Sequence, residues 1–200
     1  MALTWLVMVD AYLRPGECVD LCVSQVLHAT QIKHMRSVAL LLHPDERGIA
    51  SKTGERNESL LLQRSWLGRH ISTWAKHRRQ EKLWDFNLAE MRTIFNQIAA
   101  SLSLSRWKPV LYMGRHSGAS LDRLTDNLPL AEVQKRGRWR SEASVRRYEK
   151  RALVQEVYLG LPNNIKAIAH RSEAALEKLL DRLMLARFGS RGAMTGTSHS

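Results

Sequence analysis

Apolar residues near the start of the chain recur at the three- and four-residue steps that place them on one helix face: Leu3, Leu6, Val7 and Ala11. The tetrapeptide Arg14-Pro15-Gly16-Glu17 interrupts this pattern, because Pro and Gly favour turns. Apolar positions resume at Val19, Leu21 and Val23. The first part of the chain is therefore predicted to form helix, turn and helix.

Two short apolar runs follow, at residues 37–42 and 57–62, and a turn-rich segment at residues 45–54 separates them. Short apolar runs bounded by Pro, Gly, Asp and Asn are typical of strands joined by a hairpin. The pattern predicts a β-hairpin or small sheet, with Lys52 at its tip or on its second strand.

Helical spacing returns at residues 65–82, through Trp66, Ile71 and Trp74, and at residues 88–102, through Met91, Ile94, Phe95 and Ile98. Tryptophans at this spacing favour a packed core over a surface on which bases stack. Further predicted segments run from Pro109 to Leu124 and over residues 130–135, and further helices cover residues 144–159 and 165–187. The small, polar residues 189–200 predict a frayed tail.

These segments predict an α+β fold that is mostly helical, with a small antiparallel sheet. The 200 residues, 44% of them hydrophobic, suit one domain with a sizeable core, with or without a small appendage. One side of the last helix is apolar, so this helix is able to dock on its own chain or on a partner. Its apolar positions are Ile168, Ala169, Leu176, Leu179, Leu180 and Leu183.

The charge balance indicates a partner that is a polyanion. Lys and Arg number 31 against 19 Asp and Glu, which gives a formal charge of +12 and a pI near 10.3. Nucleic acid is the first expectation, although ribosomal and membrane-surface proteins are equally basic.

The two cysteines, Cys18 and Cys22, lie four positions apart, and no second pair completes a metal site or a disulfide framework. We expect reduced thiols in an intracellular protein, in the nucleus of a eukaryote or the cytoplasm of a bacterium. The apolar start of the chain has no basic leader, and Asp10 and Arg14 interrupt it before a membrane-spanning length. No membrane, metal or cofactor is therefore expected.

A tyrosine stands inside the most basic stretch of the chain. Between Ala131 and Arg151 there are eight Lys or Arg and three Glu, and Tyr148 lies among them. A phenol has a reference pKa of about 10 and is a poor nucleophile near neutral pH unless cations favour its anion. Tyr148 is therefore a candidate nucleophile for attack on a phosphate.

Four separated motifs resemble, in this order, the catalytic domain of the tyrosine recombinases, or phage-integrase family. They are Tyr12-Leu13-Arg14-Pro15-Gly16-Glu17, Ser51-Lys52-Thr53-Gly54, Gly114-Arg115-His116-Ser117-Gly118-Ala119-Ser120 and the stretch from Trp139 to Tyr148. The resemblance covers residues 1–159. Arg14 and Glu17 match the first family motif and Lys52 the hairpin lysine. Arg115 matches the second arginine, and Trp139 stands nine positions before Tyr148 as the family pattern requires.

The chain departs from the family at Tyr112, where the His-x-x-Arg motif has histidine. A phenol donates one hydrogen bond but does not become a cation near pH 7, so the resemblance leaves both retained and lost activity open. His116, beside Arg115, is a candidate substitute proton donor. The family's N-terminal DNA-clamping domain is also expected to be absent, because Arg14 follows closely on Met1. A fragment, a reduced enzyme and a remnant all fit.

The resemblance implies a metal-free transesterification of DNA. Arg14 and Arg115 would bind the non-bridging oxygens of one phosphate, Tyr148 would attack phosphorus, and Lys52 would protonate the leaving oxygen. Trp139 would pack or donate a hydrogen bond at the phosphate, and Glu17 would orient an arginine. Each residue also has an ordinary structural explanation when taken alone, and Lys52 is the least specific of them.

The resemblance also implies double-stranded DNA as the partner, held in a homo-oligomeric synaptic assembly. Backbone contacts are expected from Lys76, Arg78, Arg79, Arg136, Arg138, Arg140 and Arg147. Residues 1–160 would form the catalytic domain, residues 161–188 a helix able to dock on a neighbouring protomer, and residues 189–200 a flexible tail.

The expected role is DNA integration or site-specific recombination of a mobile element. A non-catalytic DNA-binding remnant of such an enzyme and a type IB topoisomerase-like activity are the alternatives. A basic helical RNA binder would leave the spacing of Trp139 and Tyr148 unexplained.

Overall fold

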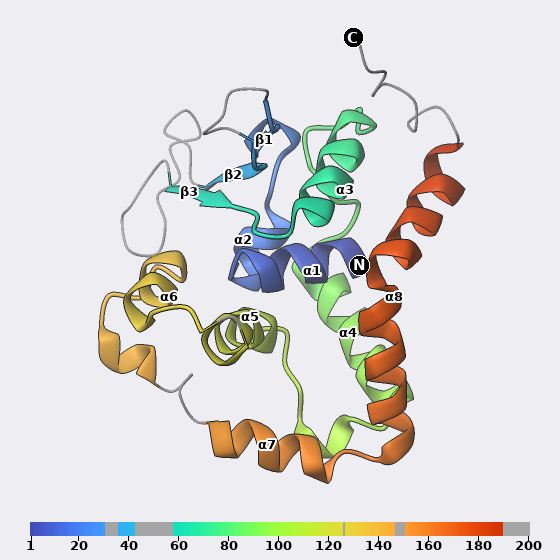
Figure 1. Cartoon of the computed structure of the whole chain (residues 1–200). Coiled ribbons are helices and arrows are strands. Elements are labelled where there is room, and N and C mark those ends of the chain that lie inside the picture. The colour runs from blue at the N-terminus through green and yellow to red at the C-terminus, as the bar shows by residue number, and fades with distance from the viewer. Residues whose placement is uncertain (31–35, 43–57, 126, 147–150, 190–200) are drawn as a thin grey trace, which may run out of the picture.

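The computed structural model describes residues 1–30, 36–42, 58–125, 127–146 and 151–189. They form a mostly helical α+β fold with a small antiparallel sheet, which confirms the predicted fold class (Figure 1). The helices are α1 (Ala2–Asp10), α2 (Pro15–Val19), α3 (Ser65–Lys76), α4 (Leu88–Ser101), α5 (Met113–Leu124), α6 (Leu130–Arg136), α7 (Arg151–Gly160) and α8 (Asn163–Phe188). The strands are β1 (Val26–Leu27), β2 (Ala39–Leu42) and β3 (Glu58–Leu61).

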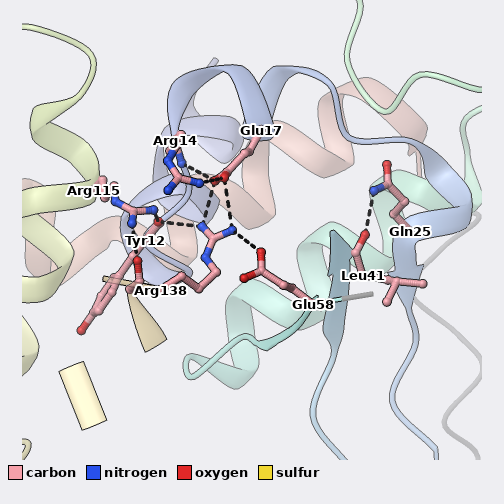
Figure 2. Close-up of polar contacts among 9 residues, drawn as sticks. Tyr12, Arg14, Glu17, Gln25, Leu41, Glu58, Arg115 and Arg138 are labelled. Carbon is pink, nitrogen blue, oxygen red and sulfur yellow. Dashed lines mark hydrogen bonds and ion pairs between the residues drawn. The ribbon is translucent and has the colours of Figure 1, made fainter. Parts of the chain in front are cut away.

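The sheet contains the two predicted strands and a third that the sequence did not predict. Strand β2 pairs antiparallel with β3, with Leu40 opposite Leu60, and with β1, with Leu40 opposite Val26. The prediction of helix through Val23 was wrong, because a 3₁₀ turn at Val23–Gln25 leads into β1. The Gln25 side chain then donates to the Leu41 carbonyl at 2.7 Å, which ties this turn to the sheet (Figure 2).

Helix α1 lies between the sheet with α3 on one side and α5 with α6 on the other (Figure 1). Its inner residues, such as Val7 and Met8, are completely buried. Two glycines four positions apart on α5 allow the close approach of α1. A Cβ at Gly118 would lie 2.0 Å from the Val9 carbonyl oxygen, and one at Gly114 would lie 2.6 Å from Met8 Cε. This close packing sets the position of Arg115, which lies between them in sequence.

Two predicted helices have different bounds in the structure. Helix α3 ends at Lys76, not at residue 82, because the following chain turns back to pair with residues after α2. The Leu83 amide donates to the Leu21 carbonyl and the Val23 amide to the Glu81 carbonyl, each at 2.9 Å. Residues 142–144 form a 3₁₀ turn where a helix was predicted to begin, and α7 is described from residue 151.

Helix α8 packs on α3 of its own chain. Leu180 is buried, and the Arg69–Glu177 and His70–Asp181 pairs join the two helices at 2.5 and 3.0 Å. Leu179 and Leu183 on the same helix are exposed. Docking of this helix on a neighbouring protomer therefore stays a prediction.

Within the described part of the chain, no helix is both long enough and apolar enough to cross a membrane.

Candidate functional site

The first matched motif forms the start of α2. Arg14 precedes the helix in an extended conformation, and Pro15 fixes the first helical residue. The Glu17 carboxylate accepts a hydrogen bond from the Arg14 backbone amide at 2.7 Å and a second from the Arg14 guanidinium. The Arg14 side chain stays 23% exposed. Its guanidinium is thus held at one end by Glu17 and remains accessible to a ligand.

Arg115 is the most deeply buried member of the site, at 0% exposed. Its Nη1 donates to the Tyr12 carbonyl at 2.6 Å and its Nη2 to the Gly137 carbonyl (Figure 2). Burial, and then the neighbouring charge of Arg138, lower the pKa of this guanidinium. Its Nε has no hydrogen-bond partner among the described residues. Arg115 therefore holds together two backbone segments that are far apart in sequence.

Trp139 covers Arg115 from the turn after α6. The Arg115 guanidinium carbon lies 4.6 Å from the centre of the Trp139 indole ring. The centres of the Tyr12 and Trp139 rings are 6.0 Å apart. Gly137 makes room for this arrangement, because a Cβ there would lie 1.7 Å from Trp139 Cζ3. The structure thus brings Arg14, Arg115 and Trp139 together around Tyr12.

Tyr112 and His116 lie one turn apart at the start of α5, and their ring centres are 4.8 Å apart. The Tyr112 side chain is exposed. Tyr112 is also near enough to influence the guanidiniums of Arg14 and Arg115 electrostatically. Partial burial lowers the pKa of Arg14, but the charge and hydrogen bond of Glu17 outweigh it, and the Tyr112 phenol adds to the net rise. Tyr112 therefore lies at the edge of the cluster.

A third arginine, Arg138, lies in the same cluster and is less exposed than Arg14. Its guanidinium bonds to Glu17 at 2.8 and 3.2 Å and to Glu58 of β3 at 3.1 Å (Figure 2). Burial raises the pKa of Glu17, but the charges and hydrogen bonds of Arg138 and Arg14 lower it more, so the net pKa is below its ordinary value. Glu17 is consequently ionised throughout the neutral range.

Arg136 lies in a second polar network on the other side of Tyr12. It pairs with Asp122 at 2.8 Å and donates to the Asp10 carbonyl. The Tyr12 hydroxyl donates to the same Asp122 carboxylate, and Arg64 pairs with the Asp10 carboxylate at 2.6 Å. These contacts face the protein interior, so they weigh against direct phosphate contact by Arg136. The pairing of Arg138 weighs against such contact in the same way.

The other residues predicted to contact DNA differ in their exposure and in their partners. Lys76, Arg79 and Arg140 are exposed, whereas Arg78 pairs with Asp85 at 2.5 Å. Arg140 lines a surface cavity beside the arginine cluster, together with Glu58, Gln134, Lys135, Arg138 and Trp139. Lys52, Arg147 and Tyr148 lie outside the described residues. Their roles stay predictions.

The sequence motifs did not reveal the inward role of Arg138 or any role of Glu58. Arg138 adopts a left-handed backbone conformation, with φ of 55°, which no periodicity signals. Glu58 comes from a strand that is distant in sequence. The spacing of Gly114 and Gly118 is the signal that could have indicated the close packing of α1 and α5.

No cluster of three or more His, Cys, Asp or Glu side chains suited to a metal ion occurs among the residues that the structure places.

The fold is similar to that of the XerH site-specific recombinase, solved with its difH substrate in a pre-cleavage complex. The match has a TM-score of 0.55 and 18% sequence identity, and it covers 80% of this chain. It covers 46% of the recombinase, so the chain spans about half the length of that protein. No family model and no curated protein matches the sequence. The similarity therefore shows that the chain shares the fold of part of this recombinase.

Proposed function

We propose that this protein cleaves and rejoins DNA strands through a 3′-phosphotyrosine intermediate, in DNA integration or site-specific recombination. The observation that carries this proposal is the meeting of Arg14, Arg115 and Trp139, from three separated segments, within one recombinase-like fold. Guanidinium groups match the geometry of phosphate oxygens and offset the charge that develops in phosphoryl transfer.

In this proposal, Arg14 binds a non-bridging oxygen of the scissile phosphate. Arg115, which is buried, adds positive charge behind the site and holds the Tyr12 and Gly137 backbone segments in place. The Tyr148 oxygen attacks phosphorus, and the bond from phosphorus to the 5′ oxygen breaks. Lys52 gives that oxygen its proton. Trp139 shields the phosphate from water, and Tyr112, with His116 beside it, donates a hydrogen bond at the edge of the site. Glu17 orients Arg14.

Double-stranded DNA is the proposed partner, bound through backbone phosphates by exposed cations such as Lys76, Arg79 and Arg140. Lys76 lines a groove with Arg36 and with Arg69, which is paired with Glu177 of α8. Such binding weakens steeply as salt rises. We also propose an intracellular homo-oligomer on DNA, with residues 1–160 as the catalytic domain.

The decisive experiment is a nicked duplex that traps a cleaved strand, with covalent protein–DNA adducts resolved on a denaturing gel. The wild-type protein is expected to form an adduct and Tyr148→Phe is expected to form none. DNA affinity should be nearly equal in the two proteins, because only a hydroxyl group differs. An adduct that persists in Tyr148→Phe would contradict the assignment of the nucleophile.

The second candidate is a DNA-binding remnant without catalysis. It is favoured by Tyr112 at the position of the motif histidine and by Arg115, whose two amino groups are bonded to backbone carbonyls. Salt-sensitive DNA binding with no adduct would support it.

Tyr112→His separates the two candidates further. If the missing histidine limits an otherwise competent site, this variant should form adduct faster than wild type in the same assay. A rate equal to the wild-type rate would indicate that Tyr112 or His116 already supplies the proton.

A further inference from the structure

Arg138 is an arginine whose backbone and side chain are both constrained toward the interior. Its φ of 55° lies in the left-handed region, which non-glycine residues adopt rarely. Its side chain is 7% exposed and bonds to Glu17, to Glu58 and to the Tyr12 carbonyl, the last at 3.3 Å. A residue that served only as surface charge would need neither this conformation nor these partners.

The Glu17 carboxylate is shared between two arginines. Arg138 contributes hydrogen bonds to both of its oxygens, and Arg14 contributes one from its backbone amide and one from its guanidinium (Figure 2). Without Arg138, Glu17 would keep only its bonds from Arg14, and the capacity released on Oε2 would let the Arg14 guanidinium pair with both carboxylate oxygens. Such pairing would withdraw Arg14 from any ligand.

The charges of the cluster lead to the same conclusion. Three arginines, Arg14, Arg115 and Arg138, lie with two glutamates, Glu17 and Glu58, which leaves one net positive charge among these five side chains. A DNA phosphodiester carries one negative charge. Without Arg138 the same group would be neutral and would lose its electrostatic preference for an anion.

We propose that Arg138 is a positioning residue for phosphate binding, which engages Glu17 and Glu58 so that the Arg14 guanidinium remains available to one DNA phosphate. This inference rests on the proposed function, because that function makes Arg14 a phosphate ligand. Arg138 itself does not touch the phosphate.

The test compares Arg138→Gln, Arg138→Lys and the double variant Arg138→Gln/Glu17→Gln with wild type. Arg92→Gln is the matched control, because Arg92 is exposed on α4 and its loss changes the net charge by the same amount. Each protein is titrated with a fluorescent duplex at several salt concentrations, and its rate of adduct formation on the nicked duplex is measured. Melting by circular dichroism establishes that each variant is folded.

Arg138→Gln is expected to lower the slope of log affinity against log salt by ~0.9, the value for one phosphate contact. Adduct formation should slow by roughly 10- to 100-fold, the range seen when supporting partners of metal-binding side chains are removed. Glu17→Gln in the double variant should restore most of both losses, since it frees Arg14 and restores the net charge. Arg138→Lys should keep the salt slope, and Arg92→Gln should resemble wild type.

The proposal is overturned if Arg138→Gln behaves like Arg92→Gln, or if Glu17→Gln restores nothing in a folded double variant. If Arg138→Gln does not fold, Arg138→Lys decides, because a wild-type salt slope supports the charge role and a reduced slope contradicts it. Absence of an adduct in wild type would count against strand cleavage alone. The salt slopes would still determine the role of Arg138.

Discussion

Two polar networks meet at Tyr12, and they differ in charge balance. The network at the Tyr12 hydroxyl pairs Arg64 and Arg136 with Asp10 and Asp122, so its charges cancel. The network at the Tyr12 carbonyl contains Arg14, Arg115 and Arg138 with two glutamates and keeps one positive charge. Each network has one partly exposed arginine, Arg64 at 38% in the first and Arg14 at 23% in the second.

The difference separates a structural role from a binding role. Removal of one member from a network with balanced charges leaves an uncompensated charge. A network with an excess positive charge is suited to an anion from outside. The two networks share one residue, so the structural network holds the binding network in place.

The largest effect is expected from Asp122→Ala, which breaks the neutral network. Arg136 would lose its nearer carboxylate partner and the Tyr12 hydroxyl would lose its acceptor, so the free energy of unfolding should fall by roughly 3–5 kcal/mol. Denaturant unfolding measures this loss. The control is Asp20→Ala, which removes an ion pair whose aspartate is 74% exposed and should cost at most about 1 kcal/mol. Equal losses of unfolding free energy in the two variants would contradict a structural role for the neutral network.

An intermediate effect is expected from Gly118→Ala, which pushes α1 away from α5 and disturbs both networks together. The new methyl group would meet the Val9 carbonyl oxygen at 2.0 Å, so unfolding free energy should fall by about 1–3 kcal/mol and DNA affinity should fall with it. Gly16→Ala is the control, because nothing lies within 4 Å of a Cβ there. Unchanged stability in Gly118→Ala would show that the close approach of the helices is not required.

The smallest effect is the pH dependence that Glu17 of the cationic network contributes. The pKa of Glu17 is lower in the folded protein than its ordinary value of 4.5, because Arg138 and Arg14 outweigh the effect of burial. Its contribution to stability is therefore complete above that ordinary value and is lost as pH falls through the folded pKa. Melting temperatures measured below pH 4.5 should fall less steeply in Glu17→Gln than in wild type. Melting temperatures that fall equally with pH in the two proteins would contradict the pairing of Glu17 with Arg138 and Arg14.

Much of the fold was predictable from the sequence because long periodic segments determine helices locally. The bounds of α4 and the pairing of β2 with β3 were predicted closely. Strand β1 has only two residues, and the end of α3 depends on backbone pairing with residues far away in sequence. Neither feature produces a local pattern.

The candidate site was predictable where motifs name residues and unpredictable where contacts cross the fold. The resemblance implied that Arg14, Arg115 and Trp139 belong to one site, and in the structure the three lie near one another, although their roles stay predictions. The inward turn of Arg138 depends on two carboxylates that different elements supply, one from α2 and one from β3. Such pairing is a property of the packed structure, so a sequence pattern alone assigned Arg138 to the surface.

The bonds that hold Arg115 end on main-chain carbonyls of Tyr12 and Gly137. A main-chain carbonyl is present whatever side chain the residue carries, so these two bonds depend on the path of the backbone. The indole that covers Arg115 depends instead on one side chain being absent, because a Cβ at Gly137 would overlap Trp139.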